Sequence, residues 1–454
     1  MLLVRDSSFY KRLLCLAIPL SLQNLLTFGV SFADNLMVGQ LGEEAMAGLY
    51  LGTLVQLILQ LILFGVENSM MVLNTQYWGK GDCKSIRQIS AIGMHAGIFF
   101  AAAIALLTGF FPEMCLGWLT PDQGAITAGA PYLRVVAWAY VPFAVMMLLL
   151  SCLRSVEIVR IGLYDSIIAL VVNVALNYIF IFGKFGCPAM GVKGAALGTV
   201  LARLVELSVV AWYAFCYDKR LGMKIRDFFC GWNHVFAHDL FKCGWPLMMG
   251  QVVWAINNFA QTAIIGQMNS IGIASASVAD MANRLLWMGT TGVVAATGII
   301  TGKTIGEGKL DLMKQYAKTM QIIFLGIGIF SGSVIYFGQD LLLSFYSLKP
   351  DTIAMAKTIL VVLAVIITGR CYQASCLLGL VRAGGDTSFV FKNDTFWVFC
   401  FVLPSAYIAQ HYLHAPVWVV YACLSSDQIT KCFVALWKVN SFNWMHNLTR
   451  DNAR

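Results

Sequence analysis

The residue with the clearest capacity for chemistry is Asp34, an acid inside an apolar stretch that begins at Lys11. The stretch KRLLCLAIPLSLQNLLTFGVSFADNL is long enough to cross the hydrocarbon core of a membrane as a helix. Ionised side chains at that depth are costly and are more often functional than structural. Surroundings of low dielectric favour the neutral acid, so this carboxyl group can take up and release a proton. We predict that Asp34 binds a small cation, with a purely structural acid as the alternative.

Two amides elsewhere in the chain have the spacing expected of partners for this acid. Asn173 and Asn177 lie four residues apart in an apolar run, so they share one face of a helix. Amide oxygens can ligate a cation or accept a proton from a neutral carboxyl group. The alternative is hydrogen bonding between helices without a functional role. Pro19, in the same helix as Asp34, removes a backbone donor and is predicted to act as a helix hinge.

Most other charges within apolar runs come in pairs at helical spacing, which favours mutual neutralisation over function. Glu67 and Arg370 have no partner at helical spacing, so they are candidates to line a cavity. A fixed positive charge at Arg370 would disfavour cationic substrates close to it. The pairs at helical spacing are Arg203/Glu206, Asp280/Arg284 and Asp427/Lys431.

The sequence predicts neither a metal centre nor an enzyme. It lacks HExxH, GxSxG and Walker A motifs. Without a nucleotide-binding loop, any work must be driven by an ion gradient, and no cofactor is expected. One group of potential metal ligands matches no common zinc module in its spacing, and consists of Cys230, His234, His238 and Cys243.

The composition is that of a polytopic membrane protein. Of the 454 residues, 59% are hydrophobic and 12% are charged, whereas a soluble domain is about 25% charged. Apolar runs near or above the spanning length recur from end to end. We predict twelve transmembrane helices, over 12–36, 47–77, 90–111, 130–152, 163–183, 194–216, 241–264, 273–301, 319–338, 355–380, 394–412 and 416–438.

The connections between these runs alternate in positive charge. Lys80, Lys84 and Arg87 follow the second run, whereas the GQLGEE connection before it has no Lys or Arg. Connections rich in Lys and Arg also follow the fourth, sixth, eighth and tenth runs. The positive-inside rule therefore places both termini in the cytoplasm of a cell (plasma) membrane. Topology explains the net charge of +8, so no nucleic-acid partner is expected.

The two halves of the chain repeat each other at an offset of 227 residues. Pro19 falls on Pro246 and Gly81 falls on Gly308, and because these residue types set backbone shape, the match predicts shared geometry. Six spans are an even number, so both halves face the same way, an arrangement typical of transporters. The predicted parts are an N-lobe over 1–216, a cytoplasmic linker over 217–240, a C-lobe over 241–440 and a cytoplasmic tail over 441–454.

The chain resembles the bacterial multidrug and toxic compound extrusion (MATE) transporters along nearly its whole length. The resemblance rests on PLSLQNLLTFGVSFADNLMVGQLGEEAMAG, QYWGKGD with its counterpart TIGEGKLD, NVALNYIFIFG, GVKGAALGTV and LVRAGGDT. It implies an all-α integral membrane protein, with two pseudo-symmetric six-helix lobes around a central cavity. It also implies export of small amphipathic, mostly cationic drugs by alternating access, driven by inward flow of H⁺ or Na⁺.

The resemblance also assigns roles to single residues. It gives the coupling role to Asp34 and the kink to Pro19, and it adds Tyr132 and Thr199 to the cation site. One subgroup often has Asp at the position of Asn177, so this chain has one carboxylate fewer, which favours H⁺ over Na⁺. Another subgroup has acids on the seventh and tenth helices, where this chain has none. No C-lobe cation site is therefore expected, and the candidates to line the cavity there are Gln251, Asn257, Gln261 and Arg370.

Two other functions fit the sequence less well. A flippase for lipid-linked oligosaccharide or another amphipathic lipid would need several basic groups in its cavity, and Arg370 is the main unpaired one. A receptor that does not transport would have no need of a second bundle. The expected partners are a small drug-like molecule and the lipid bilayer, and nothing in the sequence requires more than a monomer.

Overall fold

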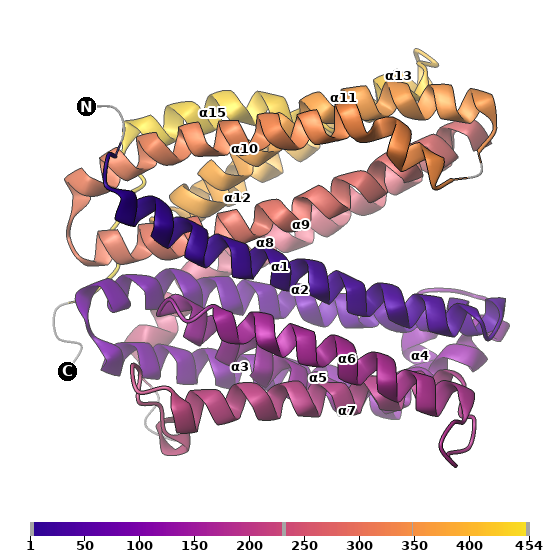
Figure 1. The fold of residues 1–454 in the computed structure, drawn as a ribbon, viewed down its shortest axis with the longest axis horizontal. Helices are drawn as coiled ribbons and strands as arrows, with labels where there is room; N and C mark the ends of the chain where they lie inside the picture. The colour runs from indigo at the N-terminus through magenta and orange to yellow at the C-terminus, as the bar shows by residue number, and fades with distance from the viewer. Residues whose placement is uncertain (1–3, 229–232, 347, 451–454) are drawn as a thin grey trace. The chain divides into compact units, whose positions relative to one another are not determined.

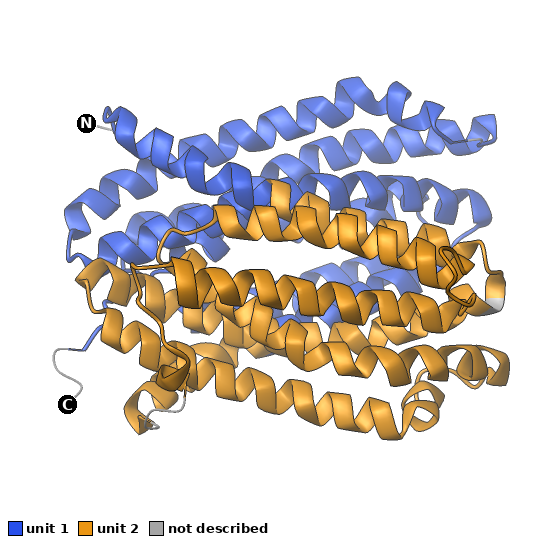
Figure 2. Cartoon of the chain, turned by 60° about the horizontal axis from the view of Figure 1, so that its bottom comes forward, with its two compact units in different colours: residues 1–21, 249–450 blue, residues 22–248, 451–454 orange. Residues whose placement is uncertain are grey.

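The computed structural model describes residues 4–228, 233–346 and 348–450, and its regular elements are helices apart from one bridge between Gly385 and Met445 (Figure 1). Contacts divide the chain into two compact units (Figure 2). Unit 1 consists of Met1–Ser21 and Met249–Arg450, and unit 2 of Leu22–Met248 and Asp451–Arg454.

The described part of unit 2 contains six complete α-helices and parts of two others. The core of this unit forms around α5, which packs against α2, α3 and α7. Its elements are α1 (Ser7–Gly39, from Leu22), α2 (Glu43–Lys80), α3 (Cys83–Phe110), α4 (Pro112–Gly117), α5 (Gln123–Ser155), α6 (Arg160–Phe182), α7 (Val192–Trp212), the π-helix η1 (Tyr213–Tyr217), the 3₁₀-helix η2 (Ile225–Phe228) and α8 (His234–Gly266, to Met248).

Unit 1 contains the remaining helices. Its core lies where α11 packs against α9 and α10. Besides the first part of α1 and the last part of α8, its elements are α9 (Ser270–Gly306), α10 (Leu310–Ser344), α11 (Pro350–Ala374), the π-helix η3 (Ser375–Val381), α12 (Thr387–Trp397), the π-helix η4 (Val398–Val402), α13 (Leu403–His411), α14 (Val417–Leu424) and α15 (Asp427–Ser441).

The helix surfaces are those of a protein that lies in lipid. Large apolar side chains are exposed along both units, including Trp138 at 77% and Phe337 at 81%. Ten helical runs of the described residues are long and apolar enough to cross a membrane. The two predicted segments that are not among these ten, 241–264 and 394–412, fall on α8 and on the run from α12 to α13.

The structure confirms that the two halves repeat each other. Helices α1 and α8 both have 33 residues, and their bounds differ by 227 at each end. The next pair, α2 and α9, begins at positions that are also 227 apart. Gly81 and Gly308, which the repeat superimposes, both adopt left-handed backbone conformations, with φ of 79° and 74°. A side chain would strain these turns, so glycine is required at both.

Helices α1 and α8, the first helices of the two repeats, each belong partly to one unit and partly to the other. In both, the division comes two residues after the proline, Pro19 or Pro246. The part of α1 before Leu22 belongs to unit 1, and the part of α8 before Met249 belongs to unit 2. In each unit, the helix segment approaches a glycine of a neighbouring helix. A Cβ atom at Gly292 of α9 would collide with Ser21, and one at Gly65 of α2 would collide with Met248. The units therefore differ from the predicted lobes at these two segments, and the lobe boundaries at 216 and 240 stay a prediction.

Candidate ion-coupling site

Helix α1 brings Asp34 beside the predicted amides of α6. The Asn177 side-chain nitrogen donates one hydrogen bond to the Asp34 carboxylate and another to Asn173 Oδ1, at 3.3 Å. Asn173 is 2% exposed and Asn177 is fully buried. The structure thus places the three residues together, as the sequence predicts, while their role in ion binding stays a prediction.

Close packing of α7 on α6 determines where the Asn177 amide lies. Gly198 of α7 faces this amide, and a Cβ atom there would collide with Asn177 Oδ1. One turn earlier, a Cβ atom at Gly194 would lie 2.5 Å from the Phe180 carbonyl oxygen. The small residues of GVKGAALG therefore permit the helix approach that directs Asn177 towards Asp34.

The Asn177 side-chain oxygen is buried and has no hydrogen-bond partner among the described residues. Buried acceptors of this kind are rare, because losing water without a replacement donor is costly. A proton or a small cation held beside Asp34 would supply the missing interaction. The available donor set is the carboxylate and the two amide oxygens, and oxygen ligands of this kind suit either H⁺ or Na⁺.

Tyr132 and Thr199, which the family resemblance adds to the cation site, differ in their relation to Asp34. Tyr132 is 4% exposed, and its ring packs against Gly52. The Asp34 charge acts on the Tyr132 hydroxyl, so this tyrosine belongs to the surroundings of the acid. Thr199 donates its hydroxyl hydrogen to the Ala195 carbonyl oxygen of its own helix, at 3.0 Å. The described contacts do not join Thr199 to Asp34.

The main neighbour of Asp34 that the sequence did not reveal is Arg203. The predicted pair with Glu206 is confirmed, with 2.7 Å between Arg203 Nη1 and Glu206 Oε2. The same guanidinium group also interacts electrostatically with Asp34. Arg203 lies one turn of α7 after Thr199, and this spacing was the available signal. A permanent positive charge that acts on Asp34 disfavours bound Na⁺ more than it disfavours the neutral protonated acid.

Glu67, which lacks a partner at helical spacing, has one in the folded chain. Arg154, near the end of α5, lies 2.9 Å from the Glu67 carboxylate of α2. The Glu67 residue is only 7% exposed. Glu67 has no partner at helical spacing because its partner comes from another helix. That it lines a cavity stays a prediction.

Of the candidates in the second half, Arg370 has the best defined surroundings. Its guanidinium donates to Asn283 Oδ1 at 2.7 Å and lies 4.1 Å from the centre of the Trp287 ring. Gln261 donates to the Leu424 carbonyl oxygen at 3.3 Å, while Asn257 has a buried side-chain oxygen without a partner among the described residues. Gln251 is partly buried on α8. That these residues line a cavity stays a prediction.

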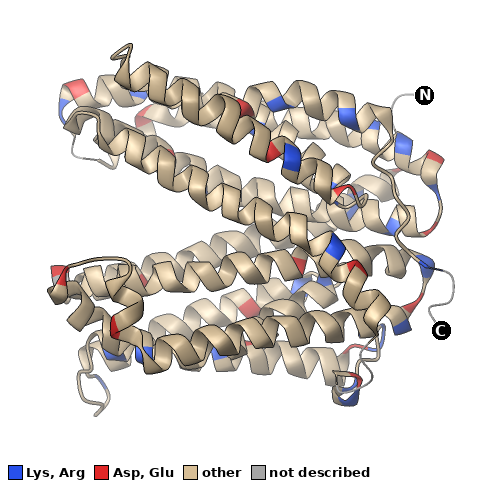
Figure 3. Cartoon of the chain, turned by 180° about the vertical axis from the view of Figure 1, so that it is seen from behind, with Lys and Arg blue, Asp and Glu red and all other residues tan. Residues whose placement is uncertain are grey.

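The remaining charged pairs have more partners than their spacing in the sequence predicts. Lys431 contacts Asp427 at 2.9 Å, as its spacing predicts, and also Asp394 of α12 at 2.8 Å. Asp280 interacts electrostatically with Arg284 and accepts a 3.4 Å hydrogen bond from Tyr421. Figure 3 shows how few charges interrupt the helices. Their mutual pairing supports a structural role.

No cluster of three or more potential metal ligands occurs among the described residues. Among the potential ligands Cys230, His234, His238 and Cys243, the first lies outside the described residues, and α8 begins at His234. Pro19 lies inside α1, as expected of a hinge, and its bending role stays a prediction.

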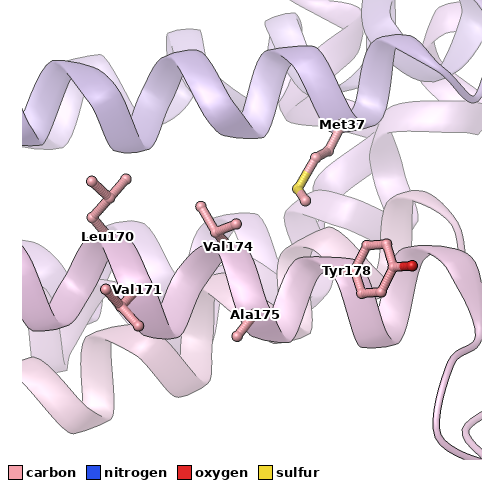
Figure 4. Close-up of a pocket in the computed structure, with 6 residues that line it drawn as sticks. All are labelled: Met37, Leu170, Val171, Val174, Ala175 and Tyr178. Atoms are coloured by element: carbon pink, nitrogen blue, oxygen red, sulfur yellow. The ribbon is translucent and has the colours of Figure 1, made fainter.

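A shallow pocket of about 490 Å³ lies between α1 and α6 (Figure 4). Met37 approaches from α1, and the other lining residues come from α6. Val171 is 63% exposed, so the hollow opens on the outer surface of unit 2. Its lining is apolar and does not include Asp34, so this hollow is not the candidate ion site. The lining residues are Met37, Leu170, Val171, Val174, Ala175 and Tyr178.

Comparison with known proteins gives matches over both halves. The MatE family model matches residues 19–179 and again 246–408, and the two starts are 227 residues apart. A probable multidrug resistance protein NorM from Agrobacterium fabrum is 25% identical over 382 residues, covering 83% of this chain and 81% of the relative. Another protein of that description, from Thermotoga maritima, is 23% identical over 456 residues, covering 98% and 95%.

Solved structures have the same fold. The Vibrio cholerae MATE transporter VcmN, in its bent form, superimposes with a TM-score of 0.84 at 17% identity, covering 96% of this chain and 97% of that one. The eukaryotic MATE transporter AtDTX14 has a TM-score of 0.82 at 15% identity, with the same coverage. The fold is therefore twelve transmembrane helices in two lobes.

Proposed function

Because the chain belongs to the MatE family of efflux transporters, whose model matches both of its halves, we propose that it exports drugs in exchange for H⁺ or Na⁺. Asp34 is the residue that holds the coupling ion. The substrates are small amphipathic compounds, most of them cationic. This proposal rests on the family and on relatives described as multidrug resistance proteins.

The observation that carries the ion-coupling role is the surroundings of Asp34. The carboxylate accepts a hydrogen bond from Asn177, whose own side-chain oxygen is buried without a partner among the described residues. Ion binding at Asp34 removes this unsatisfied state, because a neutral acid can donate where the carboxylate can only accept. The two charge states therefore favour different hydrogen-bond arrangements, which is what a coupling site requires.

The proposed cycle is alternating access. Substrate enters from the cytoplasm or the inner leaflet while Asp34 holds its ion. The protein opens outwards, the substrate leaves, and a new ion from outside resets the site. Pro19 of α1 absorbs the bending of the helix that carries Asp34. The protein works as a monomer in the cell membrane, with both termini in the cytoplasm.

The decisive experiment replaces Asp34 with Asn. Asparagine keeps the size of the side chain but neither titrates nor carries charge, so Asp34→Asn abolishes dye or drug efflux in proteoliposomes. The matched control is Asp311→Asn, because the Asp311 side chain is 94% exposed and its ion pair with Lys314 is worth little. Efflux by the control equals that of the wild type.

Separately imposed proton and sodium gradients identify the ion. Thermal unfolding of both variants shows that the folded state is retained. Normal efflux by Asp34→Asn under either gradient would remove the proposed role of this acid. Movement of a lipid-linked sugar, with no drug efflux, would favour the flippase function instead.

A further inference from the structure

Unit 2 contains a buried acid that the proposed cycle does not use and that has no ion pair among the described residues. Asp165 lies on α6 and is 3% exposed. One of its carboxylate oxygens, Oδ1, has no hydrogen-bond partner among the described residues. Asp165 precedes Asn173 by eight residues, which corresponds to about 12 Å along a helix axis. It is therefore separate from the site at Asp34.

A second unpartnered acceptor lies on the same side of α6. The Gln23 side-chain oxygen of α1 is buried and has no hydrogen-bond partner among the described residues. A Cβ atom at Gly162 would lie 2.5 Å from this oxygen. Gly162 precedes Asp165 by three residues, so both share one helix face. Both oxygens are buried acceptors without a donor among the described residues, and a proton on Asp165 would supply a donor.

The buried and partly buried charged groups on α1 from Leu22, α2, α5, α6 and α7 also do not balance when all are ionised. The four carboxyl groups belong to Asp34, Glu67, Asp165 and Glu206, and the two guanidinium groups to Arg154 and Arg203. Each guanidinium is already in an ion pair, Arg154 with Glu67 at 2.9 Å and Arg203 with Glu206 at 2.7 Å. In the described part of the chain, neither Asp34 nor Asp165 has such a pair. Protonation removes the excess charge at low dielectric.

The charged groups that act on Asp165 are Glu206 and Arg203 of α7 and Arg154 of α5. Gly198 of α7 packs against Asn177, which contacts Asp34, and Arg203 follows Gly198 by five residues. Its guanidinium acts on Asp34 as well, so it links the electrostatics of both unpaired acids. Ionising one acid therefore changes the free energy of ionising the other, because both compete for the same positive charge.

From this arrangement we propose that Asp165 is a second proton-binding carboxyl group, coupled to Asp34 through Arg203. Each event is a simple transfer, in which the carboxylate gains H⁺ to become the neutral acid or releases it to water or a neighbouring carboxylate. The binding of a proton at Asp165 does not depend on the proposed function. Its participation in transport rests on the proposed function of Asp34.

Infrared spectroscopy of the full chain in lipid nanodiscs tests the proton directly. At about pH 6, exposed carboxyl groups are ionised, so the C=O stretching band of neutral acids reports buried ones. Asp165→Asn removes the absorbance of one carboxyl group from this band, and the exposed control Asp311→Asn removes none. Asp165→Glu keeps an absorbance of the same size. An unchanged band in Asp165→Asn would overturn the proposal.

The coupling has its own test. A pH titration of the Asp165 band is repeated in Asp34→Asn, and the midpoint moves because Arg203 no longer faces two acids. An unmoved midpoint would overturn the coupling. Thermal unfolding checks that each variant is folded, and Asp165→Glu replaces any variant that is not.

Transport measurements separate this inference from the proposed function. Asp165→Asn changes the pH profile of efflux, and Asp165→Glu restores it. If Asp34→Asn still exports drug while Asp165→Asn loses its band, the proposed function fails and the proton site at Asp165 stands. If Asp34→Asn is inactive and Asp165→Asn keeps the wild-type band, the proposed function stands and the proton site at Asp165 is overturned.

Discussion

At the residue scale, the choice of ion depends on how many negative charges surround the site. Asp34 has two amides beside it and a guanidinium within electrostatic range. A hard cation such as Na⁺ gains most from carboxylate ligands. One acid partly matched by Arg203 is a poor sodium site, whereas a proton needs a single carboxylate. Within the proposed function, this arrangement favours H⁺ over Na⁺ as the coupling ion.

A single substitution should change this balance. Asn177→Asp adds a second carboxylate beside Asp34, and we expect a sodium gradient to stimulate its efflux more than that of the wild type. Asn177→Ala, which supplies no oxygen, should lower efflux under both gradients. Proteoliposomes with separately imposed gradients provide the measurement. Equal sodium responses in Asn177→Asp and the wild type would show that ligand charge does not select the ion here.

The sequence could predict the contacts of Asp34 but not all the charges around it. An acid deep in an apolar run and two amides on one helix face are visible as patterns, and the structure joins them. Asp165 lies only two residues inside the predicted run 163–183, where an acid near the membrane surface needs no partner. Arg154 pairs with Glu67 across two helices, and spacing along one chain segment cannot reveal such a contact.

At the scale of elements, the site depends on the contact between α6 and α7. The approach at Gly198 leaves no room for a methyl group beside the Asn177 amide. The hydrogen bond from Asn177 to a carboxylate therefore requires glycine on the neighbouring helix, although Gly198 itself makes no polar contact with the ion site.

We expect Gly198→Ala to lower the efflux rate at least about tenfold. The added methyl group displaces Asn177, and a hydrogen bond to a charged group contributes ~1.5–3 kcal/mol, where 1.4 kcal/mol corresponds to a factor of ten. Gly250→Ala is the control, because no atom lies within 4 Å of a Cβ atom there. Initial rates of dye efflux at matched protein density provide the measurement. Equal rates in both variants would show that the packing does not position the amide.

The positions of the helices could be predicted from the sequence better than their type, α-helix or π-helix. The repeat at 227 residues anticipates the matching bounds of α1 and α8, because prolines and glycines mark the same backbone turns. The π-helical segments η1, η3 and η4 have no such mark. They depend on tertiary contacts, and hydrophobic periodicity does not distinguish them from α-helix. The predicted run 416–438 likewise divides into α14 and α15.

At the scale of the whole molecule, the positive charge of alternate connections predicts the orientation. Cys187 lies between α6 and α7, in a connection predicted to face outwards, and Cys83 begins α3 on the predicted cytoplasmic side. Both are partly exposed. In backgrounds that retain only one of them, we expect a membrane-impermeant maleimide to label Cys187 in intact cells. Cys83 should react only after permeabilisation, and the reverse pattern would contradict the predicted topology.

The division of α1 after Ser21 and of α8 after Met248 between the two units affects the order in which the protein can fold during translation. The segment of α8 that lies at Gly65 leaves the ribosome only after α2 to α7 have been synthesised. The first segment of α1 must likewise wait for α9 and its Gly292. Neither unit can complete its packing during the first half of translation, so the early helices lack these contacts until the later segments have been synthesised.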